Sequence, residues 1–157
     1  MTGPARRLRA LIFFIVLCCT ATVAFAAAAP VGYDISVRID PAARELSGAA
    51  TIIVESGKSV ELVLAQRFEV ERMTVDGETA AAPRVASGLS TWRLIAANTP
   101  RRIEIRWHGR LDALDATLDH RQTLGASTPV TGGEGTFLPA ASAWYPQVRG
   151  RMPGYRV

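Results

Sequence analysis

Residues 101–111, RRIEIRWHGRL, show the most regular pattern in this sequence. The apolar residues Ile103, Ile105 and Trp107 stand at every second position, and charged or polar residues stand between them. This period of two is typical of a β-strand that has one face against a core and the other face in water. The segment therefore predicts one long strand of a half-exposed sheet.

The same alternation recurs upstream of this strand, and turn residues separate its occurrences. Asp76-Gly77 is a strong hairpin-turn signal, because both residues tolerate a positive φ angle. No amphipathic helical pattern stands between the strands, which favours an all-β domain, either an antiparallel β-sandwich or a saddle-shaped sheet. The further predicted strands cover residues 33–39, 46–54, 60–64, 68–75 and 90–95.

Downstream of residue 111 the alternation stops. Residues 112–135 contain scattered Asp, Gly, Thr and Pro and predict a long loop, in which Gly132-Gly133-Glu134-Gly135 forms a flexible turn. Trp144-Tyr145-Pro146 follows, and prolines with buried aromatics suit an ordered crossing into further structure. Residues 154–157 resemble the start of another strand, so we expect the chain to be the front part of a larger protein.

The first 26 residues have the three parts of a secretory signal peptide. Arginines precede an apolar run of about ten residues, and Ala24-Phe25-Ala26 provides an A-x-A cleavage site. We expect cleavage after Ala26, with Ala28 as the alternative, and a mature β domain of residues 27–157. The predicted location is periplasmic or secreted. The alternative is a membrane anchor formed by an uncleaved signal, because the apolar tract extends to about fifteen positions.

The net charge of +4 comes mainly from this leader. Residues 27–157 carry 15 basic and 14 acidic residues, a net charge of +1. Because nucleic-acid binding needs Lys and Arg clustered on one face, no nucleic-acid partner is predicted. Both cysteines, Cys18 and Cys19, lie in the leader, so the mature part can form no disulfide or thiolate metal site. No lipid anchor is expected, because Leu17 rather than a small residue precedes Cys18.

Motifs of catalysis are weak in the mature part. His108 and His120 do not stand in a His-Glu-x-x-His motif, and no Gly-x-Ser-x-Gly motif occurs. An acidic group near His120 lacks the calcium-loop pattern, so we interpret it as solvated loop acids rather than a cation site. This acidic group consists of Asp112, Asp115 and Asp119. Two further acids, Glu69 and Glu71, are interpreted as solubilising residues on one face of a strand.

Three tryptophans stand in the mature part. We interpret them as core or interface anchors rather than as platforms for sugar binding. They are Trp92, Trp107 and Trp144. Taken alone, the residues of this chain predict no catalytic group, no metal and no cofactor.

Several short segments within residues 31–157, taken together in their order and spacing, resemble the N-terminal β domain of the M1 family of zinc aminopeptidases, particularly its secreted bacterial members. The resemblance implies a saddle-shaped antiparallel sheet that packs on a catalytic domain, and zinc that belongs only to that catalytic domain. This sequence has neither the His-Glu-x-x-His motif nor the length for such a domain. The segments that carry the resemblance are Tyr33-Asp34-Ile35-Ser36-Val37-Arg38-Ile39-Asp40-Pro41, Leu46-Ser47-Gly48, Phe68-Glu69-Val70 before Val75-Asp76-Gly77, Ile103-Glu104-Ile105-Arg106-Trp107-His108-Gly109 and Trp144-Tyr145-Pro146.

The resemblance also implies one substrate-binding residue. In that family, an acidic or amide side chain of the N-terminal domain holds the free α-amino group of the substrate, and Glu134 is the nearest counterpart here. We therefore expect the non-catalytic N-terminal domain of a secreted metallo-aminopeptidase-like protein, cut short before its catalytic domain, with a peptide substrate or that catalytic domain as its partner. The alternative is a stand-alone periplasmic β-sandwich module that binds a partner through exposed aromatics or an open sheet edge.

Overall fold

The computed structural model describes residues 31–115, 117, 125, 127–149 and 154–155. This part of the chain consists of β-strands, connecting turns and one 3-10 turn, which confirms the all-β prediction. The predicted signal peptide, Asp119 and His120 lie outside the described residues. The elements are β1 (Val31–Asp40), β2 (Glu45–Val54), β3 (Val60–Ala65), β4 (Phe68–Val75), β5 (Glu78–Thr79), β6 (Arg84–Ala86), β7 (Leu89–Leu94), β8 (Arg101–Arg110), β9 (Asp112–Ala113), β10 (Val130–Gly132), β11 (Gly135–Phe137), η1 (Ala140–Ser142), β12 (Gln147–Val148) and β13 (Gly154–Tyr155).

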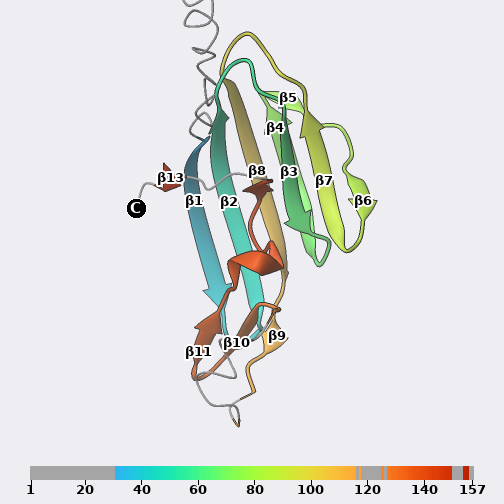
Figure 1. Cartoon of the computed structure of the whole chain (residues 1–157). Helices are drawn as coiled ribbons and strands as arrows, with labels where there is room; N and C mark the ends of the chain where they lie inside the picture. Colours follow the sequence, from blue (N-terminus) through green and yellow to red (C-terminus); the bar gives the residue numbers. More distant parts are fainter. Residues whose placement is uncertain (1–30, 116, 118–124, 126, 150–153, 156–157) are drawn as a thin grey trace, which may run out of the picture.

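The largest sheet has six strands in the order β13-β1-β2-β8-β4-β5 (Figure 1). Adjacent strands of this sheet are antiparallel, except that β13 runs parallel to β1. β1 and β2 form the predicted hairpin, with Tyr33 opposite Ile52. The Asp40 carboxylate stabilises its turn by accepting the N–H groups of Ala42 and Ala43 at 3.0 Å. β8 pairs with β2 over its whole length, so the most regular stretch of sequence lies in the centre of the sheet.

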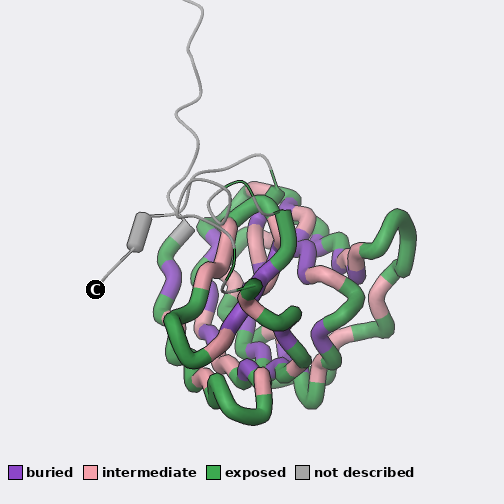
Figure 2. Tube along the Cα trace, turned by 90° about the horizontal axis from the view of Figure 1, so that it is seen from below, coloured by how far each residue is buried: buried purple, intermediate pink, exposed green. Residues whose placement is uncertain are grey.

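A second sheet, β12-β3-β7-β6, packs on one face of the first. Leu62 and Leu64 of β3 share a single core with Ile103, Ile105 and Trp107 of β8. These five side chains are at most 2% exposed, and burying one such side chain contributes about 1.5–3 kcal/mol. In Figure 2 the buried stretches, in purple, lie mostly inside the folded tube, while the outer loops are largely exposed, in green. The architecture is therefore a β-sandwich, one of the two that the sequence predicts.

Among the described residues, no second sheet packs on the other face of the six-stranded sheet, and we call it the open face. Alternate residues of β1, β2 and β8 point to this face, because their neighbours in sequence point into the core. Most of them are polar or charged, and all are exposed or half-buried. They are Asp34, Ser36, Arg38, Ser47, Ala49, Thr51, Ile53, Arg102, Glu104, Arg106 and His108.

The prediction of a long loop over residues 112–135 is wrong at both of its ends. There β9, β10 and β11 form a three-stranded sheet in the order β11-β10-β9, with β9 parallel to β10. Strands of two or three residues are too short to show an alternation in sequence. Their pairing therefore depends on tertiary contacts that the local sequence does not reveal.

Residues 138–148, which we call the crossing segment, join the two larger sheets. The indole N–H of Trp107 donates to the Trp144 carbonyl oxygen at 3.0 Å, which fixes the segment to β8. The N–H of Val148 donates to the Tyr33 hydroxyl at 2.8 Å, which fixes it to β1, while β12 pairs with β3. The ordered crossing that the prolines and aromatics predict is therefore confirmed.

Candidate functional site

Glu134 lies at the tip of the hairpin formed by β10 and β11. Gly132 pairs with Gly135, so Gly133 and Glu134 are the two residues of the turn, as the glycine-rich sequence predicts. Gly135 has a φ angle of 148°, which favours glycine. The Glu134 side chain is exposed and forms no ion pair with any residue that the structure describes.

The base of this hairpin is tightly packed. Thr131 is fully buried, and its hydroxyl oxygen lies 2.6 Å from that of Thr136 on the neighbouring strand. The N–H of Leu114 donates to the Thr131 carbonyl oxygen at 2.9 Å. At Gly132 a Cβ would lie only 3.2 Å from the Leu114 Cβ, so a glycine permits this close approach. The hairpin thus offers Glu134 on a short turn above an ordered base.

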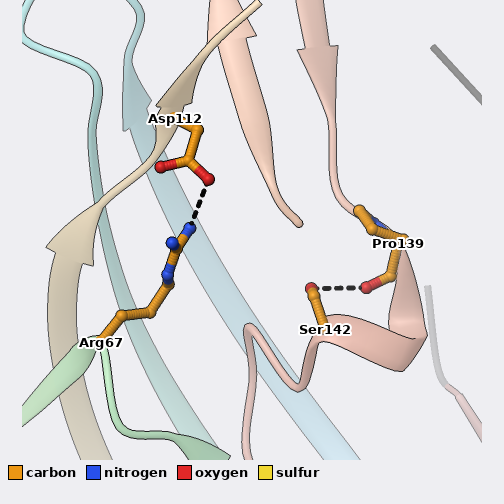
Figure 3. Close-up of polar contacts among 4 residues, drawn as sticks. All are labelled: Arg67, Asp112, Pro139 and Ser142. Atoms are coloured by element: carbon orange, nitrogen blue, oxygen red, sulfur yellow. Dashed lines mark hydrogen bonds and ion pairs between the residues drawn. The ribbon is translucent and has the colours of Figure 1, made fainter. Parts of the chain in front are cut away.

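An ion pair ties β9 to the start of β4. The Arg67 guanidinium lies 3.0 Å from the Asp112 carboxylate, and Figure 3 shows the two side chains pointing toward each other. This hydrogen bond lowers the pKa of Asp112, and partial burial opposes it. The N–H of Asp112 also donates to the Pro129 carbonyl oxygen at 3.0 Å, just before β10. The hairpin is therefore connected to the large sheet by a charged contact as well as by the chain.

On its other side the hairpin continues into the crossing segment. The Ser142 hydroxyl donates to the Pro139 carbonyl oxygen at 2.7 Å across η1 (Figure 3). The Trp144 indole N–H donates to the Leu138 carbonyl oxygen at 3.1 Å, so the half-buried ring folds back over its own segment. Both ends of the hairpin are thus held by ordered structure, which limits the positions that Glu134 can reach.

The three tryptophans and Asp115 have structural roles in the fold. Trp92 and Trp107 are buried and Trp144 is half-buried, which agrees with their interpretation as anchors. Asp115 accepts hydrogen bonds from the backbone and hydroxyl of Thr117, which lower its pKa. Within the ranges that the structure describes, no group of three or more His, Cys, Asp or Glu side chains could hold a metal ion. No helix there is long and apolar enough to cross a membrane.

His108 joins the two glutamates of β4 on the open face. Its Nδ1 lies 3.0 Å from a carboxylate oxygen of Glu71, and its Nε2 lies 3.7 Å from one of Glu69. All three side chains are exposed, which agrees with the interpretation of the glutamates as solvated residues. Sequence reasoning missed the neighbouring pair Arg72 and Arg106, which lie opposite each other on this face.

No family of known proteins matches the chain, and no curated protein does. Among solved structures, the chain is similar to an M1 zinc metallopeptidase from Deinococcus radiodurans bound to a Tyr-Ser-Ala substrate, with 17% identity and a TM-score of 0.41 over 59% of this chain and 23% of that one. A two-domain M1 zinc metallopeptidase bound to L-arginine gives 16% identity and a TM-score of 0.40, over 57% of this chain and 22% of that one. The chain thus spans less than a quarter of the length of either structure.

Proposed function

We propose that this chain is a non-catalytic β domain of the M1 aminopeptidase type, which packs on a zinc-bearing catalytic domain and presents Glu134 to the substrate. The order of its sequence segments supports the proposal. The observation that carries it is the exposed Glu134 carboxylate on a two-residue turn whose base is packed. A carboxylate in such a position can reach into the cleft of a neighbouring domain.

Glu134 would bind the free α-ammonium group of a peptide substrate. A charge-assisted hydrogen bond between carboxylate and ammonium is about twice as strong as a neutral one, and it selects peptides with an unblocked N-terminus. The hydrolytic chemistry would come entirely from the catalytic domain and its zinc. In this proposal the β domain positions the substrate and takes part in no bond-breaking step.

The proposed location is the periplasm or the exterior of the cell. Residues 1–26 would direct export and would be removed after Ala26, and no lipid would be attached. The intact mass of the protein recovered from the cell envelope tests this directly. A mass that begins at residue 27 supports export with cleavage, whereas retention of the leader in a membrane fraction supports the uncleaved anchor.

Reconstitution tests the proposed role of Glu134. The purified protein is mixed with the catalytic domain of an M1 aminopeptidase from which its own N-terminal domain has been removed, and hydrolysis of aminoacyl amides is followed. We expect the mixture to turn over substrate, and Glu134→Ala to lower kcat/KM by about tenfold or more, because a hydrogen bond to a charged group contributes about 1.5–3 kcal/mol. Glu55→Ala is the matched control, since Glu55 is an exposed glutamate after β2.

Two results would overturn the proposal. Metal-dependent hydrolysis by the purified protein alone would show that it is itself a catalyst. Equal activity of Glu134→Ala and Glu55→Ala in the reconstituted mixture would remove Glu134 from substrate binding, and failure of the two proteins to associate would remove the docking role.

A second candidate function is a stand-alone module that binds an extended peptide by strand addition. It is supported by β6, which forms an edge of the four-stranded sheet and carries Val85 with 53% exposure. A bound peptide would add its backbone hydrogen bonds along β6. Val85→Pro would block this addition, because proline lacks the backbone N–H, so peptide binding that survives the substitution would exclude this edge as the site.

A further inference from the structure

A bulge in β4 changes which side chains reach the open face. Up to Val70 the strand alternates, with Glu69 exposed and Val70 half-buried. The pairing with β8 then shifts between Val70 and Arg72, so Glu71 has no residue opposite it. Glu71 and Arg72 are consequently both exposed, and Met73 returns to the core. A single extra residue thus resets the alternation of the strand.

The bulge brings Arg72 opposite Arg106 of β8. With strict alternation Arg72 would have followed Val70 toward the core. Instead, Arg72 lies directly opposite Arg106. The Cβ atoms of a directly opposite pair are about 5 Å apart, and like charges at this spacing destabilise a sheet. The strand therefore places two guanidinium groups side by side on an exposed surface, at a cost to its own stability.

Neither arginine has an acidic partner among the described residues. Two nearby acids are already engaged, since Glu71 contacts His108 at 3.0 Å and Glu104 contacts Arg102 at 2.8 Å. A third acid, Asp34, lies on β1, two strands away from β8, or about 10 Å at the usual strand spacing, and it lines the same groove without forming an ion pair to either arginine. Neither guanidinium group of the pair is therefore held in an ion pair by the part of the chain that the structure describes.

The two arginines border a groove in the open face with a volume of about 690 Å³. Small side chains of β1 and β2 line it, including Ser36, Ala49 and Thr51. Because these side chains are short, they leave space beside the longer guanidinium groups, and two of them carry hydroxyl groups that can donate hydrogen bonds. The lining also includes the carboxylates of Asp34, Glu71 and Glu104. Since His108 engages Glu71 and Arg102 engages Glu104, the groove offers two guanidinium groups, hydroxyl donors and room for a ligand.

We propose that Arg72 and Arg106 form a binding site for an oxyanion, either a phosphate or a carboxylate group. The planar guanidinium group binds such groups through two parallel N–H donors, and two guanidinium groups together can surround one anion. Binding also removes the repulsion between the two arginines. The site uses no residue of the β10–β11 hairpin, so it is independent of the proposed role of Glu134.

Titration with inorganic phosphate and with acetate tests this site. The arginine Nε–H signals of the whole protein are followed by NMR while either anion replaces chloride at constant ionic strength. We expect saturable changes at Arg72 and Arg106, and an affinity lower by about tenfold in Arg72→Gln and in Arg106→Gln. Arg72→Lys should lose most of the affinity as well, because lysine lacks the two parallel donors. Arg38→Gln is the matched control, since Arg38 lies on the same face.

Each outcome decides between ligands or against the site. Saturation by phosphate alone assigns a phosphoryl ligand, and saturation by acetate alone assigns a carboxylate. Changes that do not saturate with either anion overturn the proposal, as does an unchanged affinity in Arg72→Gln. The thermal unfolding of each variant is measured in chloride, where Arg72→Gln should be at least as stable as the parent because the like-charge repulsion is gone.

Discussion

The two faces of the six-stranded sheet are built by the same strands from alternate residues, yet they have different physical roles. On the covered face, Ile103, Ile105 and Trp107 are almost completely buried under the second sheet. On the open face, Arg102, Glu104 and other charged residues lie in water. Neighbouring positions of one strand are thus divided between the core and the solvent, because the pleat points them to opposite faces.

Truncation of one covered residue should have the largest effect. Trp107→Ala would leave a cavity in the core and would remove the hydrogen bond to the Trp144 carbonyl oxygen. We expect the free energy of unfolding to fall by about 3–5 kcal/mol, measured by urea denaturation with circular dichroism. His108→Ala changes the adjacent residue on the open face and should stay within about 0.5 kcal/mol of the parent. Equal losses in the two variants would contradict the division of the faces.

Addition of a single methyl group should give the next largest effect. Gly48 of β2 lies under the indole ring of Trp107, and a Cβ there would overlap the ring atoms. Gly48→Ala should therefore cost about 1–3 kcal/mol of stability, as overpacking usually does. At Gly32 of β1, on the open face, the nearest atom to an added Cβ is 4.0 Å away, so Gly32→Ala should not destabilise the fold. A stable Gly48→Ala variant would mean that the covered face tolerates repacking.

Charge at the exposed end of the sheet should give the smallest effect, and one that depends on pH. The Asp76 carboxylate accepts the N–H of Arg102 and the Nε–H of Arg101, both at 2.8 Å. The backbone hydrogen bond from Arg102 and then the side-chain bond from Arg101 lower the pKa of Asp76 in the folded state. A lowered folded pKa stabilises the protein above the unfolded pKa, and this contribution is lost as the pH falls through the folded value.

Asp76→Asn measures this contribution. The variant should have a lower urea midpoint than the parent at pH 7, and the difference should shrink as the pH falls below about 4, near the ordinary pKa of an aspartate. Asparagine also tolerates the φ angle of 55° at this position, so the backbone turn is retained. A difference that stayed constant from neutral to acidic pH would show that the charge of Asp76 is not its cause.

The long strands were predictable because their alternation is regular over many residues. β8 and β2 show it over ten residues each, and their predicted core positions, such as Ile52 and Ile105, are buried. The turn at Asp76-Gly77 was predictable because both residues adopt a positive φ angle. In these segments the local pattern and the tertiary packing favour the same structure.

The bulge and the small sheet were not predictable to the same degree. In β4 the adjacent charged residues Glu71 and Arg72 before Met73 interrupt the alternation, and this interruption was the one available signal of the bulge. The β9–β11 sheet depends on contacts between distant residues, such as the ion pair of Arg67 with Asp112. The sequence could therefore place Glu134 in a turn, but it could not show the packed base beneath that turn.

The bond between the Tyr33 hydroxyl and the Val148 N–H has a consequence for the order of folding. It joins residues 115 positions apart, and it lies where the crossing segment meets β1. Contacts of such long range slow folding, because a large loop must close before they form. During synthesis the hairpin of β1 and β2 can form early, but the core cannot be completed until the ribosome has released the crossing segment. The core that begins at β1 is thus completed only by the last of its segments to be synthesised.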